Sequence, residues 1–335
     1  MKAVAFTHSL PITAEEALID LDVPEPTPRR FDVLVEVKAV SVNPVDTKVR
    51  RRSEPLGEPR ILGFDAAGIV RAVGSHVTNF GIGDEIYYAG AIDRPGSNAE
   101  FQLVDERIAA RKPKTLSFAE AAALPLTSLT AWEMLFDSFK IPRDRVKQDT
   151  LLIVGGAGGV GSMAIQLARR LTGLMVVATA SRPETVEWCS ALGAHHVINH
   201  HKDLAAQFAT IEVPAPAYIF CTNQIEHHWR ALTTLLAPHG RIGLIESSAP
   251  LDLSGLFNKS ASLHTEYMFA RALHQSDHMI EQHNILQTVS RLVDQGILRT
   301  TMTSSMGRIN AANLRRAHAA IESGSARGKI VLEGF

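Results

Sequence analysis

The chain has 335 residues, of which 45% are hydrophobic and 21% are charged, and its formal net charge is −1. This composition suits a soluble enzyme with two sizeable cores, and the near-zero charge excludes the basic excess of a nucleic-acid-binding protein. Only two cysteines occur, which argues against a disulfide framework and favours a reducing compartment. No apolar run approaches membrane-spanning length, and residues 1–6 resemble a strand more than a signal peptide. We therefore expect a soluble, cytoplasmic protein with neither a membrane nor a nucleic-acid partner.

The first third of the chain is rich in predicted strands. Apolar and polar residues alternate over residues 33–42, a second strand is predicted over residues 66–73, and glycines mark the turns. A helix is predicted over residues 118–135, because Ser117 can cap it and Glu120 follows three positions later. This part forms a β-rich domain of its own.

Strands and helices alternate through the middle of the chain. The predicted strands cover residues 151–154, 175–180, 196–199, 217–221 and 240–245, and the predicted helices cover residues 162–171, 184–192 and 226–236. This alternation is typical of a doubly wound parallel sheet with helices on both faces. We place this nucleotide-binding domain at residues 127–263.

The pattern changes again after residue 263. Amphipathic helices are predicted over residues 278–295 and 311–323, and a last strand over residues 329–332. We expect this segment to return to the β-rich domain, which then comprises residues 1–126 and 264–335.

A glycine-rich turn follows the predicted strand 151–154. It contains Gly155, Gly158, Gly159, Val160 and Gly161, and with Gly156 it matches the pattern G-x-G-x-x-G. Missing side chains allow a tight turn and a close approach of the backbone to a pyrophosphate, and the helix N-terminus offers N–H groups to the phosphates. The turn predicts dinucleotide binding, although glycines between a strand and a helix can also serve packing alone.

The end of the second strand of this domain indicates which dinucleotide binds. Rossmann proteins that use NAD place an acidic residue there, whereas this chain has Ser181 and Arg182. A hydroxyl beside a guanidinium suits the 2′-phosphate of NADP, so we predict NADP(H); alternatively Arg182 is a solvated loop cation. Cys221, Thr222 and Ile245 follow or end later strands, where backbones line the cofactor.

Several further motifs resemble those of the medium-chain dehydrogenase/reductase superfamily, over nearly the full length. They are S-V-N-P-V-D at residues 41–46, G-F-D-A-A-G at 63–68, G-D-E at 83–85, A-A-A-L-P-L-T-S-L-T-A at 121–131 and G-K-I-V-L at 328–332. The chain resembles the quinone-oxidoreductase branch and, more narrowly, a bacterial subgroup labelled zinc-type alcohol dehydrogenase-like. The resemblance implies a GroES-like catalytic domain plus a Rossmann domain, a small-molecule substrate, and a homodimer formed through the nucleotide domains.

The zinc-dependent members of this superfamily hold a catalytic Zn²⁺ with a cysteine, a histidine, and a further cysteine or carboxylate. Asn43 and Phe64 stand where the first two ligands would be, and Leu126 or Thr127 stands where the third would fall. Phenylalanine cannot ligate a metal, and zinc prefers thiolate and imidazole to an amide. The four cysteines of the structural zinc lobe are also missing. We predict that the enzyme works without zinc.

The chain contains 14 histidines, and three adjacent pairs of them suggest a metal site. These pairs, at residues 195–196, 200–201 and 227–228, fall at the ends of predicted elements, where exposed histidines need no metal. We therefore predict no metal ligands. Relatives often have a tyrosine at the position of His200, near the adenosine 2′-phosphate, so we predict that His200 helps bind NADP.

Without zinc, hydride has to pass to an acceptor that hydrogen bonds alone activate, which suits a conjugated carbonyl. The resemblance places Asn43 at the cleft between the domains, where its amide could donate to the acceptor oxygen; alternatively it only closes a turn before Pro44. It also places Thr127 and Thr130 near the nicotinamide, unless they only cap or pack the junction helix.

Two carboxylates and one lysine complete the predicted site. Asp46 could position a donor or transfer a proton, although for Asp46 and for Asp65 a structural ion pair is an equal alternative. Lys329, near the C-terminus, could reach the cofactor.

The sequence thus predicts an NADPH-dependent oxidoreductase that transfers hydride to a quinone or an α,β-unsaturated carbonyl compound. Two alternatives stay open at this point: a zinc-containing alcohol dehydrogenase, and a noncatalytic NADPH-binding protein.

Overall fold

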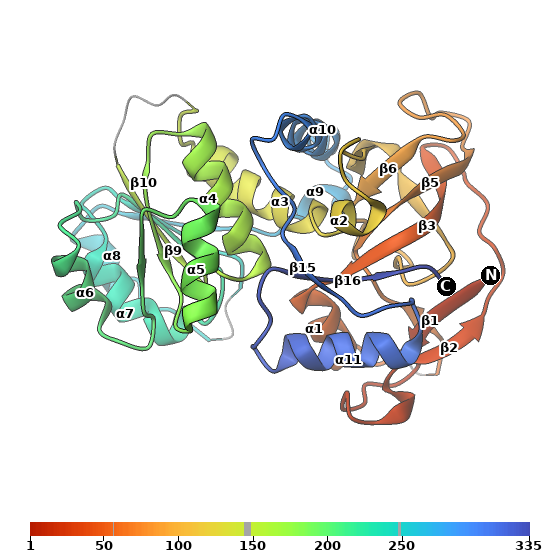
Figure 1. The fold of residues 1–335 in the computed structure, drawn as a ribbon, viewed down its shortest axis with the longest axis horizontal. Coiled ribbons are helices and arrows are strands. Elements are labelled where there is room, and N and C mark those ends of the chain that lie inside the picture. The colour runs from red at the N-terminus through yellow and green to blue at the C-terminus, as the bar shows by residue number, and fades with distance from the viewer. Residues whose placement is uncertain (56, 144–148, 247–248) are drawn as a thin grey trace. The chain divides into compact units, whose positions relative to one another are not determined.

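The computed structural model describes residues 1–55, 57–143, 149–246 and 249–335. The chain forms two compact units (Figure 1): Met1–Leu126 together with Phe269–Phe335, and Thr127–Met268. The chain returns to the first unit at Phe269 and not at residue 264, because residues 262–265 form the last strand of the parallel sheet in the second unit. The predicted combination of a β-rich unit and a doubly wound parallel sheet is confirmed.

The first unit is built on a seven-stranded sheet. Its strands are β3 (Asp32–Val42), β5 (Asp65–Val73), β6 (Glu85–Tyr88), β7 (Phe101–Asp105), β8 (Ala109–Arg111), β15 (Met302–Ser305) and β16 (Lys329–Glu333). They follow the order β15-β16-β3-β5-β6-β8, and β7 also pairs with β3. The antiparallel pairing of β16 with β3 sets Ile330 opposite Val42. The C-terminal strand is therefore part of the same sheet as the N-terminal strands.

Smaller elements surround this sheet. β1 (Lys2–Phe6), β2 (Ile19–Asp22) and β4 (Arg60–Ile61) form a three-stranded sheet in the order β2-β1-β4. The helices are α1 (Pro44–Arg52), α2 (Phe118–Ala122), α9 (Ala270–Leu273), α10 (Ile280–Asp294) and α11 (Ala311–Glu322), with 3-10 turns η1 (Glu15–Ala17) and η2 (Glu106–Ile108). Alternate residues of β3, among them Val33, Val35 and Val37, are buried in the core of this unit.

The single helix predicted over residues 118–135 is broken in the structure. The expected start is confirmed, because Ser117 and Glu120 form a capping box. The helix ends at Ala122, however, because Pro125 has no N–H to continue the hydrogen-bond ladder and restricts the residue before it. A second helix, α3, begins at Pro125 and runs to Trp132, and the π-helix η3 (Glu133–Ser138) follows it. The break leaves the carbonyl oxygen of Ala123 without a partner in the helix. This oxygen accepts a hydrogen bond from Thr301 Oγ1 at 3.1 Å instead.

The second unit contains a six-stranded parallel sheet in the order β11-β10-β9-β12-β13-β14. Its strands are β9 (Thr150–Val154), β10 (Met175–Thr179), β11 (His196–Ile198), β12 (Tyr218–Cys221), β13 (Arg241–Leu244) and β14 (Ser262–Thr265). Its further helices are α4 (Gly159–Leu171), α5 (Pro183–Leu192), α6 (Leu204–Thr210), α7 (Ile225–Leu235) and α8 (Ser254–Phe257). The short elements α6, α8 and β14 were not predicted, because each is too brief to show a clear periodicity.

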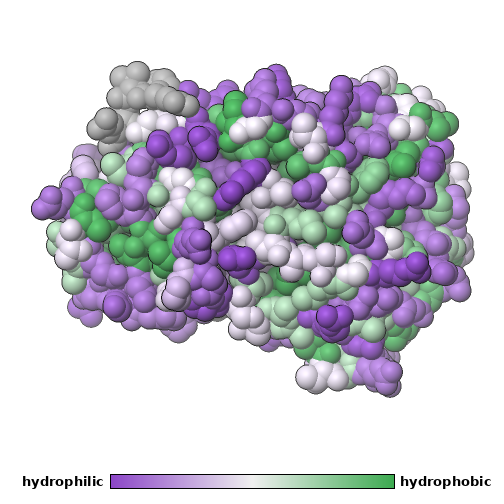
Figure 2. Space-filling model, viewed as in Figure 1, coloured by the Kyte–Doolittle hydropathy of each residue, from purple (hydrophilic) through white to green (hydrophobic). Residues whose placement is uncertain are grey.

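Every side chain of β9 is buried, as expected of a central parallel strand covered on both faces. Cys189 on α5 and Cys221 on β12 are buried and free. Among the described residues, no helix is long and apolar enough to cross a membrane. Hydrophilic residues are spread over the face shown in Figure 2, with smaller hydrophobic areas between them.

A buried arginine and a buried histidine meet where α1 packs on α11. Arg50 is 0% exposed; its guanidinium donates to the carbonyl oxygen of Leu10 and pairs with Glu322. His318 on α11 is also 0% exposed, and neither of its ring nitrogens has a hydrogen-bond partner within the described part of the chain. Burial, together with the positive charge of Arg50, lowers the pKa of His318 from 6.5 to about 3. The imidazole is therefore neutral in the folded protein at neutral pH.

This histidine makes the stability of the protein depend on pH in the acid range. Between pH 6.5 and pH 3 the unfolded chain binds one proton more than the folded chain at this position, so the free energy of unfolding falls as the pH falls. At about 1.4 kcal/mol per pH unit, the loss from this group is about 2 kcal/mol between pH 6.5 and pH 5. We expect His318→Leu to remove that part of the pH dependence in urea titrations at the two pH values. His274→Gln, at an exposed histidine, is the control; an acid-side slope unchanged in His318→Leu would contradict the prediction.

Candidate functional site

The glycine turn after β9 has the geometry expected of a dinucleotide site. Gly155 has a φ of +80°, a conformation that other residues rarely adopt, and a Cβ on it would lie 2.5 Å from Thr222 Oγ1. A Cβ on Gly156 would lie 2.8 Å from the Cβ of Ala178. A Cβ on Gly161 would lie 2.3 Å from the carbonyl oxygen of Gly155. These three glycines are required by the turn itself and by the packing of α4 against the sheet.

Gly158 differs from these glycines because space remains beside it. The nearest heavy atom to a Cβ built there is the carbonyl oxygen of Gly155, at 3.5 Å, and its φ of −71° is an ordinary one. Gly158 is the N-cap of α4, and the N–H groups of Gly159, Val160 and Gly161 lie in the first turn, so they have no acceptor within the helix. Such N–H groups favour an anion, and the open side of Gly158 lets a pyrophosphate approach the backbone. The residues present therefore fit a dinucleotide.

Ser181 and Arg182 follow β10, as the sequence indicated. Arg182 is the N-cap of α5: its backbone N–H donates to Thr185 Oγ1 at 3.1 Å. Its side chain is 40% exposed, and Nε donates to Glu184 Oε1 at 2.7 Å. The guanidinium is thus anchored at one nitrogen at the carboxyl end of the sheet, where dinucleotides bind in doubly wound folds.

The other predicted cofactor residues of this unit lie at the same end of the sheet. Cys221 ends β12 with a buried side chain whose Sγ donates to the carbonyl oxygen of Asn223 at 3.1 Å. Burial raises the pKa of this thiol to about 12, so the side chain is an inert part of the core. Thr222 Oγ1 donates to the carbonyl oxygen of Val154 at 2.8 Å and supports the glycine turn. Ile245 follows β13 and His200 follows β11, and both are half-buried.

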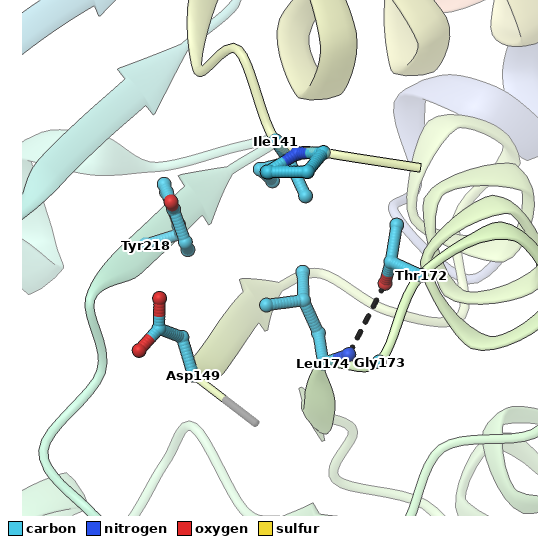
Figure 3. A pocket seen from close by; sticks show the side chains of 7 residues that line it. Ile141, Asp149, Thr172, Gly173, Leu174 and Tyr218 are labelled. Carbon is cyan, nitrogen blue, oxygen red and sulfur yellow. Dashed lines mark hydrogen bonds between the residues drawn. The ribbon is translucent and has the colours of Figure 1, made fainter. Parts of the chain in front are cut away.

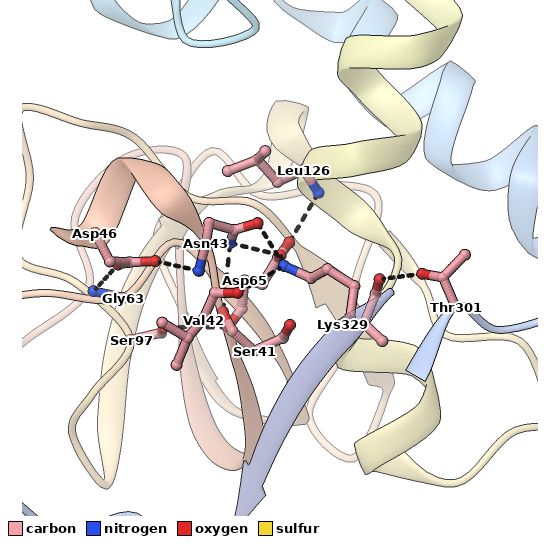
Figure 4. A network of polar contacts seen from close by, with 11 residues as sticks. Ser41, Val42, Asn43, Asp46, Gly63, Asp65, Ser97, Leu126, Thr301 and Lys329 are labelled. Atoms are coloured by element: carbon pink, nitrogen blue, oxygen red, sulfur yellow. Dashed lines mark hydrogen bonds and ion pairs between the residues drawn. The ribbon is translucent and has the colours of Figure 1, made fainter. Parts of the chain in front are cut away.

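In the first unit, a buried group of polar side chains joins segments that are far apart in the sequence (Figure 4). Asp65, at the start of β5, is 0% exposed, and its Oδ2 accepts from Asn43 Nδ2 at 2.8 Å and from Lys329 Nζ at 3.0 Å. Its Oδ1 accepts from the backbone N–H of Leu126 at 2.8 Å. A buried carboxylate is tolerable only when it is paired and hydrogen-bonded, and Asp65 meets both conditions.

The contacts of Asn43 bear on the role predicted for it, in which its amide donates to a substrate oxygen. Nδ2 donates to Asp65 and, at 3.3 Å, to the carbonyl oxygen of Ser41. The side chain is 1% exposed, and its Oδ1 accepts from Lys329. Both amide hydrogens are therefore donated to acceptors within the protein.

Asp46 also has a structural role in the folded chain. It forms a capping box with Asn43 at the start of α1: Oδ2 accepts from the backbone N–H of Asn43 at 2.7 Å, and Oδ1 accepts from that of Gly63 at 3.0 Å. Burial raises the pKa of Asp46 to about 7, although these backbone donors act in the opposite direction. At 1% exposure, its carboxyl group links the turn at Asn43 to the turn at Gly63.

Lys329, which was predicted to reach the cofactor, has its hydrogen-bond partners inside the first unit. Its ammonium is 3% exposed and donates to Asp65, to Asn43 Oδ1, and to the carbonyl oxygen of Val42 at 3.1 Å. An ammonium has three hydrogens to donate, and these acceptors account for them. Lys329 therefore serves as the internal counter-ion of Asp65, a pairing that the sequence did not indicate.

The donor set here does not fit a catalytic zinc ion. Asn43, which takes the place of one zinc ligand in the resemblance, is hydrogen-bonded to an ammonium. Phe64, which takes the place of another, is buried against Phe269 with the ring centroids 5.0 Å apart. Within the described ranges, no group of three or more His, Cys, Asp or Glu side chains is placed to hold a metal ion.

Thr127 and Thr130 lie on α3 and are 2% and 4% exposed. The start of this helix is held by the contact between Asp65 Oδ1 and the backbone N–H of Leu126, which supplies the acceptor that a helix N-terminus needs. The motif around Asp65 was recognised in the sequence, but its function as the centre of this network was not.

A small hollow lies at the amino ends of the strands of the parallel sheet, whereas the glycine turn lies at their carboxyl ends (Figure 3). Its lining includes Asp149, Thr172, Leu174 and Tyr218, close to the amino ends of β9, β10 and β12. Thr172 Oγ1 accepts from the backbone N–H of Leu174 at 3.2 Å. Ligands of open α/β sheets bind at the carboxyl ends of the strands, so this hollow is no part of the dinucleotide site.

Comparison with known proteins agrees with this architecture. Residues 29–115 match the family model of the alcohol dehydrogenase GroES-like domain, and residues 192–332 match that of the zinc-binding dehydrogenases. A zinc-type alcohol dehydrogenase-like protein of Staphylococcus aureus is 42% identical over 335 residues, which are 99% of each chain. A 2-methylene-furan-3-one reductase of Solanum lycopersicum is 40% identical over 200 residues, which are 55% of this chain and 49% of that protein.

Two solved structures extend the comparison. A protein of Rhizobium etli CFN 42, provisionally described as a zinc-dependent alcohol dehydrogenase, has a TM-score of 0.96 at 55% identity, covering 100% of this chain and 98% of that one. The quinone oxidoreductase from Coxiella burnetii has a TM-score of 0.83 at 29% identity, covering 100% and 99%.

The fold and the glycine turn define a two-domain oxidoreductase, with a GroES-like domain and a Rossmann domain that binds a nicotinamide dinucleotide. The chain belongs to the medium-chain dehydrogenase/reductase superfamily, as its motifs predicted.

The glycines of the turn allow packing and binding to be separated by substitution. Gly158→Ala should leave the melting temperature unchanged, because 3.5 Å is an ordinary contact, but weaken NADPH binding by about tenfold by obstructing the pyrophosphate. Gly161→Ala should lose about 1–3 kcal/mol of stability, because its Cβ meets backbone. Thermal unfolding and fluorescence titration measure the two effects. Gly81→Ala, with nothing within 4 Å of its Cβ, is the control; unimpaired binding by Gly158→Ala would place the pyrophosphate elsewhere.

The ion pair between Asp65 and Lys329 can be tested with a double-mutant cycle. Asp65→Asn or Lys329→Met alone leaves one buried charge without its partner and should cost about 3–5 kcal/mol in urea unfolding. The double variant should cost less than the sum of the two, since no charge is then left unpaired. Arg71→Met, which breaks a half-exposed pair with Glu36, should cost about 1 kcal/mol or less. Strict additivity of Asp65→Asn and Lys329→Met would refute the pairing.

Proposed function

We propose that this protein is a zinc-independent, NADPH-dependent reductase of quinones or α,β-unsaturated carbonyl compounds, and that it acts as a homodimer in the cytoplasm. The observation that carries the proposal is the Asp65 and Lys329 pair. A buried ammonium and an amide, both fully hydrogen-bonded, occupy the region where zinc-dependent relatives would need metal ligands. Polarisation of the substrate then depends on hydrogen bonds.

NADPH would be held by the glycine turn and by Ser181 and Arg182. The N–H groups of the first turn of α4 would hold the pyrophosphate, and the guanidinium of Arg182 would pair with the 2′-phosphate through charge-assisted hydrogen bonds. When bound, this cofactor supplies a hydride from its nicotinamide ring. NAD-dependent Rossmann proteins have an acidic residue after the second strand, whereas this chain has Ser181 and Arg182 there, which supports NADPH over NADH as the cofactor.

A conjugated acceptor suits a site without a metal. Hydride addition to an enone or a quinone places negative charge on an oxygen through a delocalised system, so hydrogen-bond donors are sufficient to stabilise it. We assign the orientation of the nicotinamide to the hydroxyls of Thr127 and Thr130, which α3 holds in place, and the final proton to solvent. Asn43 and Asp46 act indirectly, because they fix the turns around Asp65.

The enone reductase of Solanum lycopersicum and the quinone oxidoreductase of Coxiella burnetii support this choice of acceptor. The relatives named as zinc-type or zinc-dependent favour an alcohol as the substrate instead. The donor set around Asp65 supports the conjugated acceptor, because it lacks the thiolate and imidazole that zinc prefers.

The proposal is tested by steady-state oxidation of NADPH with a panel of quinones, alkenals and alkenones, and with ethanol and secondary alcohols in the reverse direction. We expect turnover with at least one conjugated acceptor, and an unchanged rate after dialysis against a chelator. Metal analysis of the purified protein should find zinc well below one ion per chain. Stoichiometric zinc whose removal abolishes activity would establish the alcohol dehydrogenase, and binding of NADPH without turnover of any acceptor would indicate a noncatalytic protein.

A further inference from the structure

Three histidines gather at the carboxyl end of the parallel sheet in the second unit. His200 follows β11, His201 is its neighbour, and His228 lies in the first turn of α7. The ring centroids of His200 and His201 are 4.4 Å apart, and those of His200 and His228 are 6.3 Å apart. We call these three residues the histidine cluster. No group of metal ligands is formed by it within the described residues.

The surroundings of the cluster are basic. Arg182, beyond the neighbouring strand β10, is close enough for its charge to act on His200, and His227 acts on His228 from within α7. The nearby acidic groups are already engaged: Glu184 pairs with Arg182, Asp203 caps α6 by accepting from Ala206, and Glu226 accepts from the backbone N–H of Ala249.

His200 itself has an unsatisfied polar atom. Its Nδ1 is buried and has no hydrogen-bond partner among the described residues. Burial and the neighbouring positive charges lower the pKa of His200, and burial and the adjacent histidines lower that of His228. His200 and His228 therefore favour the neutral form near pH 7 while no anion is bound, because a proton added to either ring would face a neighbouring positive charge.

An anion placed among these rings would favour the protonated form of the imidazoles over the neutral form. An opposite charge within about 4–6 Å raises the pKa of an imidazole by roughly 1–3 units. In doubly wound folds the 2′-phosphate of NADP binds after the second strand of the sheet, which here is β10 with Ser181 and Arg182. Because β11 pairs in parallel with β10, His200 lies at the same end of the strands as Arg182, the carboxyl end.

We propose that the histidine cluster binds the ribose 2′-phosphate of NADPH together with Arg182 and takes up protons when it does so, which makes the preference for NADPH over NADH depend on pH. This inference rests on the proposed function, because it needs NADPH as the cofactor. Arg182 supplies a charge that is constant with pH, and the cluster supplies one that appears only with the phosphate. NADH has no 2′-phosphate, so its binding has no such dependence.

The test is fluorescence titration of the full-length protein with NADPH and with NADH between pH 6.5 and pH 8.5, in the presence of EDTA. Above about pH 6 the phosphate itself is mostly dianionic, so changes in this range report on the protein. We expect the dissociation constant of NADPH to rise about three- to tenfold per pH unit, which corresponds to uptake of up to one proton. The constant for NADH should stay level. Calorimetry in buffers of different ionisation enthalpy counts the protons directly.

Variants separate the cluster from Arg182. His200→Gln and His228→Gln should flatten the pH dependence for NADPH, whereas Arg182→Ala should weaken NADPH at every pH and keep the slope. His239→Asn is the matched control, at an exposed histidine of the same unit that precedes β13 and so lies at the other edge of the sheet. A preference for NADPH that does not vary with pH, or a slope that survives in both cluster variants, overturns this inference alone. Equal affinity for NADPH and NADH at every pH overturns the cofactor assignment as well.

Discussion

The carboxylate of Asp65 is the constraint on which the first unit depends. A charge with 0% exposure is strongly unfavourable unless its oxygens are hydrogen-bonded and its charge is balanced. Among the described residues, the partners come from the loop before α1, from the start of α3 and from β16, and the partner on β16 carries the balancing charge. The last strand of the chain is therefore needed to complete a domain that the first residues begin.

The same constraint shapes the chemistry. The ammonium of Lys329 donates its three hydrogens to acceptors within the protein. It balances the charge of Asp65 and has no lone pair with which to bind a metal ion. Because Asp65 also accepts from the N-terminus of α3, the network fixes the helix that carries Thr127 and Thr130. The conjugated acceptor that we propose would suit this arrangement, because hydrogen bonds can stabilise a developing charge that is already delocalised.

The nucleotide-binding unit was largely predictable from its residues, because its signals are local. A buried parallel strand is an uninterrupted apolar run, and the glycines of the turn are adjacent in the sequence, so β9 and the start of α4 could be located directly. The edge strand β14 is too short for its periodicity to be recognised in the sequence. The helix after Ser117 is shorter than predicted, because Pro125 interrupts the hydrogen bonds that would continue it.

The sequence by itself determined the two-domain architecture, the superfamily and the dinucleotide turn, since the motifs that indicate them are residue types at fixed spacing. Only the tertiary structure decided that Lys329 neutralises Asp65, that the amide of Asn43 is consumed by that pair, and that His200 meets His228. Contacts between residues 264 or 286 positions apart leave no periodic trace in a single sequence. They arise because folding removes water from polar groups, and each group then has to find its partner wherever the chain places one.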